Sequence, residues 1–488
     1  MPEYVAGSSG GPMVCRALET ETFIEVSMRK SAALATIIIV TAGLSGACND
    51  STGPETDREY FSSQVTPRPV NVLSAEVEVR AVGYDSVVLR YARAGEDARR
   101  TPAYAFGPDS VARPALLGLA ASSLYAVEVV LVGPGETVVE VLETSTGALP
   151  GWIPTVTPVG TDTTPGYLVL SIPDGPVIVD NRGTVVWYRY EPDNTLVNFQ
   201  AHPSGDYTTY GLTNEIRAYR VLDELGRETG QIECVDYETR PHEIRIRADG
   251  TRWALCNDVR VQDLTEYGGA PNSQVIWTVL QKLSPEGILE WEWHSADHFE
   301  VTDGSNDIAG GPLEVNLTHG NAVDFDTDGN LVASFRNLNE ITKIDAQTGD
   351  IIWRMGGKNN EFAFPADPKG EFQRQHGLRI VEPGVIQLLD NSDFPPSRLL
   401  RYSVDEGART ATLQWQYIDG PEIQTLVGGN TQVYADGGAL VSFGREGRVV
   451  EVDEFGQKRW ELTGIDDVYV FRAQRIPSLY AAERIAAP

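Results

Sequence analysis

The feature that most constrains the fold is a motif that recurs along the C-terminal two thirds of the chain. It consists of an acidic or polar turn, a glycine, three further residues and a tryptophan, and it occurs at 183–187, 287–291, 349–353 and 456–460. Trp415 belongs to a copy with a longer turn, and 223–226 is a degenerate copy that lacks the tryptophan. A repeat of this length indicates an architecture built from equal supersecondary units.

The copies add up to six units, each long enough for about four strands, which is the size of a propeller blade. We therefore predict an all-β fold with a six-bladed β-propeller over residues 160–480. The turn and tryptophan should form the outer strands, with the tryptophan packed between blades. Residues 468–476 are expected to close the ring by joining the first blade. A stack of separate sandwiches is the alternative, but it would not explain the regular tryptophan.

A smaller β-domain is predicted before the propeller. Residues 69–150 contain several short segments in which apolar and polar residues alternate, as at 75–80 and 125–132. Such segments, separated by turns, are typical of a β-sandwich. The stretch 116–125, which ends in Tyr125, resembles the tyrosine corner of fibronectin type III-like domains.

The first 48 residues are predicted to be a signal or targeting segment, with Met28 as an alternative start. A basic pair follows Met28, an apolar run covers 32–44, and small residues precede Cys48, which is the order of a secretory signal. Two interpretations stay open: lipid attachment at Cys48, which would anchor the protein to a membrane, and ordinary cleavage near Ala47. Residues 49–68 are predicted to be a flexible tether. The expected location is the periplasm or, as a lipoprotein, the cell envelope.

Export makes a disulfide between Cys234 and Cys256 plausible, because these residues flank the segment that contains His242. The alternative is two buried thiols. Neither the number nor the spacing of the cysteines indicates a zinc site.

The net charge excludes one class of partner. The chain has 69 acidic and 39 basic residues, a formal charge of −30. Such a surface repels phosphate backbones, so no nucleic-acid partner is expected. A local basic pocket for a small anion, and a homodimer, are left open.

Three of the six histidines occur at the same phase of the repeat. His242, His319 and His376 each open a short strand that runs into a glycine turn. Residues at one phase of a propeller converge on its central channel, so we predict that the three imidazoles meet at one mouth of it. The remaining histidines, at 202, 294 and 298, are expected on the surface or in loops.

Four polar residues are predicted to lie at the same mouth. Arg336 ends the strand that pairs with the His319 strand, and Asn321 lies two residues after His319 on the same strand face. Asn391 and Arg398 are candidates for similar places in the next blade, as substrate-binding residues.

The segments 317–321, 334–337, 344–357 and 372–377 resemble those of bacterial arylsulfate sulfotransferases. They read Leu-Thr-His-Gly-Asn, Ser-Phe-Arg-Asn, Ile-Asp-Ala-Gln-Thr-Gly-Asp-Ile-Ile-Trp-Arg-Met-Gly-Gly and Phe-Gln-Arg-Gln-His-Gly. The resemblance covers roughly 160–470 and implies an exported six-bladed propeller preceded by a sandwich. The segments between the motifs are shorter than in well-known members, and the cysteine pair lies elsewhere.

The resemblance also implies roles for individual residues. His376 would be the nucleophile that becomes transiently sulfated, with His242, His319, Asn321 and Arg336 around the sulfate. The implied reaction moves a sulfuryl group from an aryl sulfate donor to a phenol acceptor by a ping-pong mechanism. Sulfuryl transfer requires in-line positioning and charge stabilisation rather than a cofactor or metal, and none is expected.

Two further interpretations use the same residues. The three imidazoles are a suitable ligand set for a divalent metal ion in a hydrolase, although Arg336 would repel a cation. A non-catalytic exported propeller that binds a ligand is the other alternative.

Overall fold

The chain is almost entirely β. The structure, a computed structural model, describes residues 58–486 except 192–197, 214–215, 305–312 and 467. Across this part of the chain the α-helical residues are confined to α1 (Ala481–Ala486), beside a few short 3-10 turns. No helix in the described ranges combines the length and apolar character that a bilayer span requires. The predicted leader and Cys48 lie outside the described residues.

Two sheets form the N-terminal part. One contains β1 (Glu59–Pro67), β2 (Ala75–Val82), β6 (Val111–Ala112) and β7 (Ala115–Leu116). The other contains β3 (Ser86–Ala92), β4 (Arg99–Arg100), β5 (Tyr104–Ala105), β8 (Leu124–Val132) and β9 (Glu136–Ser145). Both sheets contribute to one buried apolar cluster, for example with Val77 from β2 and Val129 from β8. This follows from the alternation of apolar residues along the strands, which places them on one face.

The start of this part differs from the prediction. Residues 59–67, expected in the flexible tether, form β1, which pairs antiparallel with β2. Tyr60 and Val65 pack against the apolar cluster of the two sheets. The segment is mostly polar, so its composition did not indicate that Tyr60 and Val65 would pack on the core.

Tyr125 occupies the place that the tyrosine-corner pattern indicates. It is buried, and its hydroxyl accepts a hydrogen bond of 2.8 Å from the backbone N–H of Ala120. The bond fastens the segment before β8 to the strand itself.

Residues 157–476 form six further sheets. They are numbered in the order in which their innermost hairpins occur along the chain. The first contains β11 (Tyr167–Ile172), β12 (Gly175–Asp180), β13 (Val185–Tyr188) and β35 (Arg472–Ile476). The second contains β14 (Phe199–Ala201), β15 (Tyr207–Thr213), β16 (Ile216–Leu222) and β17 (Glu228–Ile232). The third contains β18 (Glu238–Ile246), β19 (Arg252–Gln262), β20 (Ser273–Leu283), β21 (Leu289–His294) and β22 (Glu314–Asn316).

The remaining three sheets follow the same plan. The fourth contains β23 (Gly320–Phe325), β24 (Leu331–Phe335), β25 (Glu340–Ile344) and β26 (Ile351–Gly356). The fifth contains β27 (His376–Glu382), β28 (Val385–Asp390), β29 (Arg398–Asp405) and β30 (Thr410–Tyr417). The sixth contains β31 (Asn430–Val433), β32 (Ala439–Ser442), β33 (Val449–Val452), β34 (Lys458–Thr463) and β10 (Thr157–Val159).

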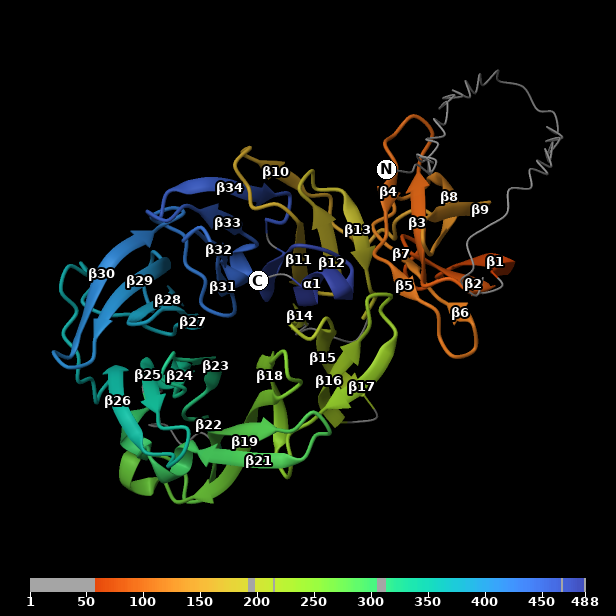
Figure 1. Cartoon of the computed structure of the whole chain (residues 1–488). Coiled ribbons are helices and arrows are strands. Elements are labelled where there is room, and N and C mark those ends of the chain that lie inside the picture. The colour runs from red at the N-terminus through yellow and green to blue at the C-terminus, as the bar shows by residue number, and fades with distance from the viewer. Residues whose placement is uncertain (1–57, 192–197, 214–215, 305–312, 467, 487–488) are drawn as a thin grey trace, which may run out of the picture. The chain divides into compact units, whose positions relative to one another are not determined.

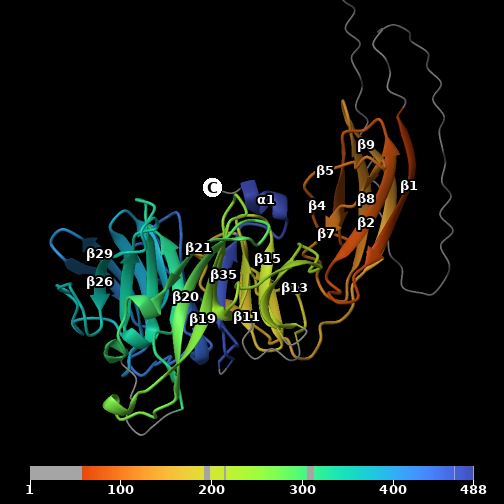
Figure 2. The ribbon, with the colours of Figure 1, turned by 90° about the horizontal axis from the view of Figure 1, so that it is seen from below.

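The six sheets follow one another around a common centre (Figure 1). Among the inner strands, β23 contacts β18 and β27, and β35 contacts β31 and β14. The two ends of this region interlock. β35, from the end of the chain, pairs with β11 of the first sheet, and Figure 2 shows the two side by side. β10, from before the first sheet, pairs with β34 of the sixth.

Two of the repeated tryptophans pack against the turn glycine of the next sheet. Trp187 of β13 contacts Gly226 of the second sheet, and its indole N–H donates to the Glu224 carbonyl at 3.1 Å. Trp415 of β30 packs in the same way against Gly456 of the sixth sheet. At these two places the glycine turn receives a large side chain from the neighbouring sheet.

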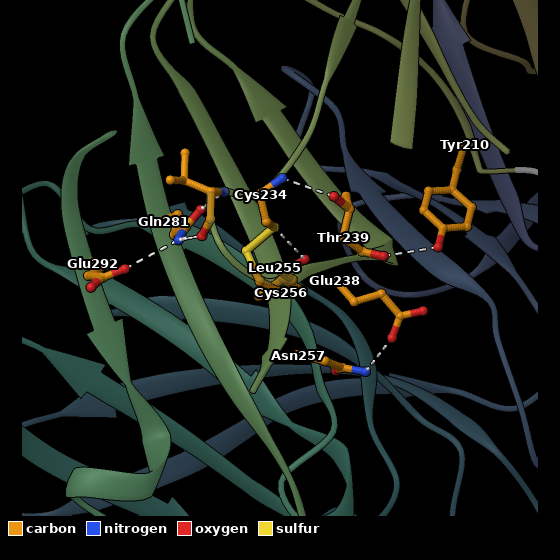
Figure 3. Close-up of a disulfide and its surroundings, with 10 residues drawn as sticks. Tyr210, Cys234, Glu238, Thr239, Leu255, Cys256, Asn257, Gln281 and Glu292 are labelled. Carbon is orange, nitrogen blue, oxygen red and sulfur yellow. Dashed lines mark hydrogen bonds between the residues drawn. A yellow bond between two sulfur atoms is a disulfide. The ribbon is translucent and has the colours of Figure 1, made fainter. Parts of the chain in front are cut away.

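A disulfide joins Cys234, which precedes β18, to Cys256 of β19 (Figure 3). The Cys234 backbone N–H also donates to the Thr239 hydroxyl at 2.9 Å. β18 pairs with β19 at both of its ends, but the register breaks between Thr239 and Ile244. The disulfide thus braces the irregular stretch of strand that contains His242.

Candidate active site

The three histidines meet at the N-terminal ends of the inner strands. His242 lies in β18, His319 directly precedes β23, and His376 is the first residue of β27. The Nε2 atoms of His319 and His242 are 3.2 Å apart. The ring centroid of His242 is 4.7 Å from that of His319 and 6.3 Å from that of His376. The structure therefore brings together the three imidazoles that the repeat predicted to converge.

The glycine after two of these histidines allows neighbouring sheets to approach closely. Gly377 has a φ of +61°, and a Cβ there would lie 2.5 Å from the backbone nitrogen of Thr431. At Gly320 a Cβ would lie 2.5 Å from the side chain of Thr278. His319 itself has a φ of +51°, in the left-handed region that side chains rarely adopt. The His-Gly pairs are thus required by the geometry that carries the imidazoles to the centre.

The hydrogen bonds of His376 assign its tautomer. Its Nδ1 lies 2.7 Å from Asn391 Oδ1 and 3.0 Å from the Arg374 carbonyl, and both of these atoms accept. The Asn391 amide is oriented in turn, because its Nδ2 donates to the carbonyls of Thr425 and Gly428. Nδ1 of His376 therefore carries the proton, and Nε2 keeps its lone pair.

His319 and His242 form a directional pair. The Asn316 Nδ2 group lies 2.9 Å from His319 Nδ1 and donates to it. The His319 proton is then on Nε2 and points to His242 Nε2, which accepts. His242 Nδ1 must carry the other proton, and it is buried with no hydrogen-bond partner among the described residues. The pair can hold and pass a proton within the site.

A buried ion network holds the backbone of His242 from behind. Arg472 donates to the His242 carbonyl at 2.9 Å and lies 3.5 Å from Glu243. Arg379 also pairs with Glu243, at 3.0 Å. These charges are placed along the inner strands beyond the imidazoles, so they fix the strand without occupying the site.

All three imidazoles are held neutral. Burial, reinforced by the charge of Arg336, lowers the pKa of His376 to about 4. Burial also lowers the pKa of His242 and of His319 well below the usual value, with neighbouring histidine and arginine charges acting in the same direction. A neutral imidazole with a free nitrogen is a nucleophile or a base at physiological pH.

Arg336 lies at the cavity that the histidines line. The cavity has a volume of about 540 Å³, within the range of small-molecule sites. The Arg336 guanidinium donates to Asn337 Oδ1 at 2.8 Å and to the Leu426 carbonyl at 3.0 Å. Both acceptors are neutral, so the positive charge remains available to an anion. Burial and the charge of Arg374 lower the pKa of Arg336 to about 10.

Asn321 supports His376 rather than facing the cavity. It is buried, and its Nδ2 donates to the Gln375 carbonyl at 2.6 Å, directly before His376. The prediction that Asn321 contacts the sulfate is not met by this arrangement, because its donor is directed at the backbone. Asn391 likewise orients His376 instead of lining the cavity.

Arg398 does not reach the cavity, contrary to its prediction as a substrate-binding residue. It is 1% exposed and pairs with Asp367 at 2.7 Å and with Asp390 at 2.8 Å. It also donates to Gln416 and to the Glu371 carbonyl. All of these partners lie in the fifth sheet or in the segment just before it. Arg398 therefore packs within the protein and is not directed at the cavity.

Several residues of the cavity were missed by sequence reasoning. Arg240, Arg445, Tyr469 and Phe471 line it. Arg240 precedes His242 by two residues, which places it on the same strand face and was a usable signal. Arg445, Tyr469 and Phe471 come from connections outside the shared phase of the repeat.

The other histidines lie elsewhere. His202 lies in the turn after β14, as expected of a loop residue, but it is buried, with its Nε2 2.8 Å from the Thr208 hydroxyl. His298 stacks on Trp293 with a centroid distance of 4.8 Å, and His294 is partly buried on β21. Across the described ranges, no three His, Cys, Asp or Glu side chains are arranged to hold a metal ion.

Replacing Asn391 with alanine tests its positioning role. We expect kcat for the reaction at His376 to fall roughly 10- to 100-fold. His376 Nδ1–H loses its shorter hydrogen bond, and the ring loses its fixed orientation. The Asn391 bond raises the pKa of His376, so the acid limb of the pH–rate profile should move to lower pH. A matched variant, Asn330→Ala, changes a turn asparagine that accepts from Ala346 and should leave kcat unchanged. An unshifted acid limb in Asn391→Ala would contradict the role.

Comparison with known proteins gives one family match. The family model described as Arylsulfotransferase (ASST) matches residues 216–465, slightly more than half of the chain. The matched segment contains all three histidines and Arg336. No curated protein matches the chain.

Three solved structures are distantly similar to the chain. A protein of unknown function from Bacteroides caccae is 13% identical, over 64% of this chain and 98% of that one, with a TM-score of 0.41. Virginiamycin B lyase from Staphylococcus aureus is 11% identical, over 70% and 92%, with a TM-score of 0.34. A streptogramin B lyase is 14% identical, over 63% and 97%, with a TM-score of 0.32.

Proposed function

The chain belongs to the arylsulfotransferase family, and from this premise we propose that it moves a sulfuryl group from an aryl sulfate ester to a phenol through a covalent intermediate on His376. The observation that carries the proposal is the bonding of His376. Its Nδ1 is held by Asn391 while Nε2 keeps a lone pair in the cavity lined by the other two histidines. No cofactor is needed in this scheme.

In the first half-reaction, the Nε2 lone pair of His376 forms a bond to sulfur. The bond between sulfur and the aryl oxygen breaks, and its electron pair leaves with the phenolate, which takes up a proton from solvent. Arg336 stabilises the charge on the sulfuryl oxygens. The Nδ1–H bond to Asn391 stabilises the imidazolium that forms.

In the second half-reaction, the acceptor phenol oxygen attacks the same sulfur from the cavity. The bond between nitrogen and sulfur breaks and returns its electron pair to Nε2 of His376. The acceptor loses its proton to the His242–His319 pair, where the 3.2 Å contact allows the proton to be shared. The pair then releases that proton to solvent, so over the complete cycle the enzyme neither gains nor loses a proton.

The proposal treats the six sheets over 157–476 as the blades of one propeller. The interlocked strands β35 and β10 support this interpretation, because each joins one end of the region to the other. It treats the two N-terminal sheets, which share one apolar cluster, as a sandwich.

We also propose that the protein is exported. The disulfide between Cys234 and Cys256 supports an oxidising compartment. Lipid attachment at Cys48, which lies outside the described residues, and a homodimer are further proposals.

The direct test is the mass of the intact protein after brief exposure to 4-nitrophenyl sulfate without acceptor. We expect a gain of one SO3 group, located on His376 by fragmentation and removed when phenol is added. His376→Ala should gain nothing. If the protein releases nitrophenol but never gains the SO3 group, the reaction does not pass through an intermediate on His376. Release of no nitrophenol from any aryl sulfate would overturn the function itself.

The pH dependence of kcat/KM for 4-nitrophenyl sulfate provides a second test. The neutral form of His376 attacks, and its pKa is about 4, so kcat/KM should stay level down to that pH. Below it, kcat/KM should fall by roughly tenfold per pH unit as Nε2 takes up a proton. A second limb is expected near pH 10, where Arg336 loses its charge. Circular dichroism at each pH separates these limbs from unfolding, and an acid limb near 6.5 would contradict the buried, neutral His376.

A further inference from the structure

The cavity contains more positive charge than the transferred group requires. Arg217, Arg240, Arg336 and Arg445 all line it, in a chain whose formal charge is −30. An aryl sulfate ester has a single negative charge. Arg336, whose charge acts on both His319 and His376, is sufficient to neutralise it. The other arginines therefore need a separate explanation.

Two of these arginines have no partner among the described residues. Arg217 is paired with Glu238 at 3.3 Å. Within the part of the chain that the structure describes, the guanidinium groups of Arg240 and Arg445 have neither a hydrogen-bond acceptor nor a carboxylate within ion-pair distance. Acidic residues outnumber basic ones in this chain, so leaving two cationic side chains unpaired at one cavity indicates that an anion from solution pairs with them.

An aromatic wall connects this charge to the histidines. The ring of Phe471 is 6.1 Å from that of His242 and 6.1 Å from that of Tyr469. Phe471 and Tyr469 precede β35, whereas Arg240 lies in β18 and Arg445 in the short 3-10 helix Gly444–Glu446. An aryl group placed on this wall has its reacting oxygen toward the histidines, and its other substituents face the remaining lining of the cavity.

We propose that Arg240 and Arg445 form a subsite for a carboxylate on the aryl group, so that the preferred substrates are phenols, and phenyl sulfates, that carry a carboxylate. A planar guanidinium matches a carboxylate through two parallel hydrogen bonds, which a neutral substituent cannot replace. The inference rests on the proposed sulfuryl transfer and specifies which aryl compounds it uses.

The test compares two acceptors that differ only in charge, 4-hydroxyphenylacetate and 4-hydroxyphenylacetamide, with 4-nitrophenyl sulfate as the donor. We expect kcat/KM for the acetate to exceed that for the acetamide by roughly tenfold, the size of one charge-assisted hydrogen bond at a partly exposed site. In Arg240→Gln and Arg445→Gln the ratio of kcat/KM for the acetate to kcat/KM for the acetamide should fall to about one, whatever the change in the individual rates. Arg80→Gln, which removes an exposed charge bonded to Glu78 in the N-terminal sheets, should retain it.

The outcomes separate the subsite from the function. Equal kcat/KM for the two acceptors in the unaltered protein would overturn the subsite and leave sulfuryl transfer intact. An acetate preference that survives in both Arg240→Gln and Arg445→Gln would also overturn it, because the preference would arise elsewhere. If neither acceptor nor phenol accelerates nitrophenol release, the proposed function and the subsite fail together.

Discussion

Replacing His376 with alanine is expected to lower the rate of nitrophenol release from 4-nitrophenyl sulfate by roughly 10³-fold or more, the effect of deleting a covalent nucleophile. The reason is the combination of features found at this one ring. Asn391 fixes the proton on Nδ1, burial keeps the ring neutral, and Nε2 is left with its lone pair. His242 and His319 cannot take over, because the Nε2 atoms of these two residues are directed at each other.

The measurement is a stopped-flow record of nitrophenol release under single-turnover conditions, which isolates the formation of the intermediate. His298→Ala is the matched control, since its ring stacks on Trp293 away from the cavity and its removal should leave the rate unchanged. A thermal unfolding curve shows whether His376→Ala remains folded. A loss below tenfold in folded protein would mean that another group attacks the sulfur.

The convergence of the histidines could be predicted from sequence because residues at equivalent places in successive repeats lie at equivalent places in the fold. His242, His319 and His376 each occupy the same place in successive units, and a ring of units brings that place to one centre. The glycine turns and tryptophans could be recognised for the same reason. Trp187 and Trp415 fill the space beside the next turn, so the spacing of these tryptophans reflects the packing of whole sheets.

The roles of the surrounding polar residues could not be predicted in this way. Asn321 and Asn391 were recognised as neighbours of the site, but the direction of an amide depends on which backbone carbonyls lie near it in three dimensions. Asn391 Nδ2 meets the carbonyls of Thr425 and Gly428, more than thirty residues away in sequence. No local pattern contains that information.

The cationic and aromatic lining was missed for a related reason. Arg445 and Phe471 reach the cavity from connections that differ in length and conformation from one sheet to the next. A repeat predicts only the features that all of its copies have in common. Arg445 and Phe471 lie in connections that differ between the copies. Substrate preference is therefore the part of the site for which the structure adds most.

Arg398→Met is expected to lower the free energy of unfolding by about 3–5 kcal/mol, because it leaves Asp367 and Asp390 as buried charges without their cation. Arg398 is 1% exposed, and the side chains of both carboxylates are almost fully buried. Methionine fills most of the volume of the arginine stem. The loss therefore measures the missing charge and hydrogen bonds rather than a cavity.

Urea denaturation followed by tryptophan fluorescence measures this change, and kinetics on the folded variant distinguishes packing from substrate binding. Because Arg398 is absent from the cavity lining, KM for 4-nitrophenyl sulfate should stay within about twofold, as expected for a residue that provides no binding energy. Arg113→Met is the control, since Arg113 forms an exposed pair with Glu78 and such pairs contribute about 0–1 kcal/mol. A large rise in KM with unchanged stability would restore Arg398 to the substrate-binding role that its position at a strand end first suggested. A loss of stability with unchanged KM would instead make the buried Arg398–Asp367–Asp390 cluster part of what holds the fifth sheet, and with it His376, in place.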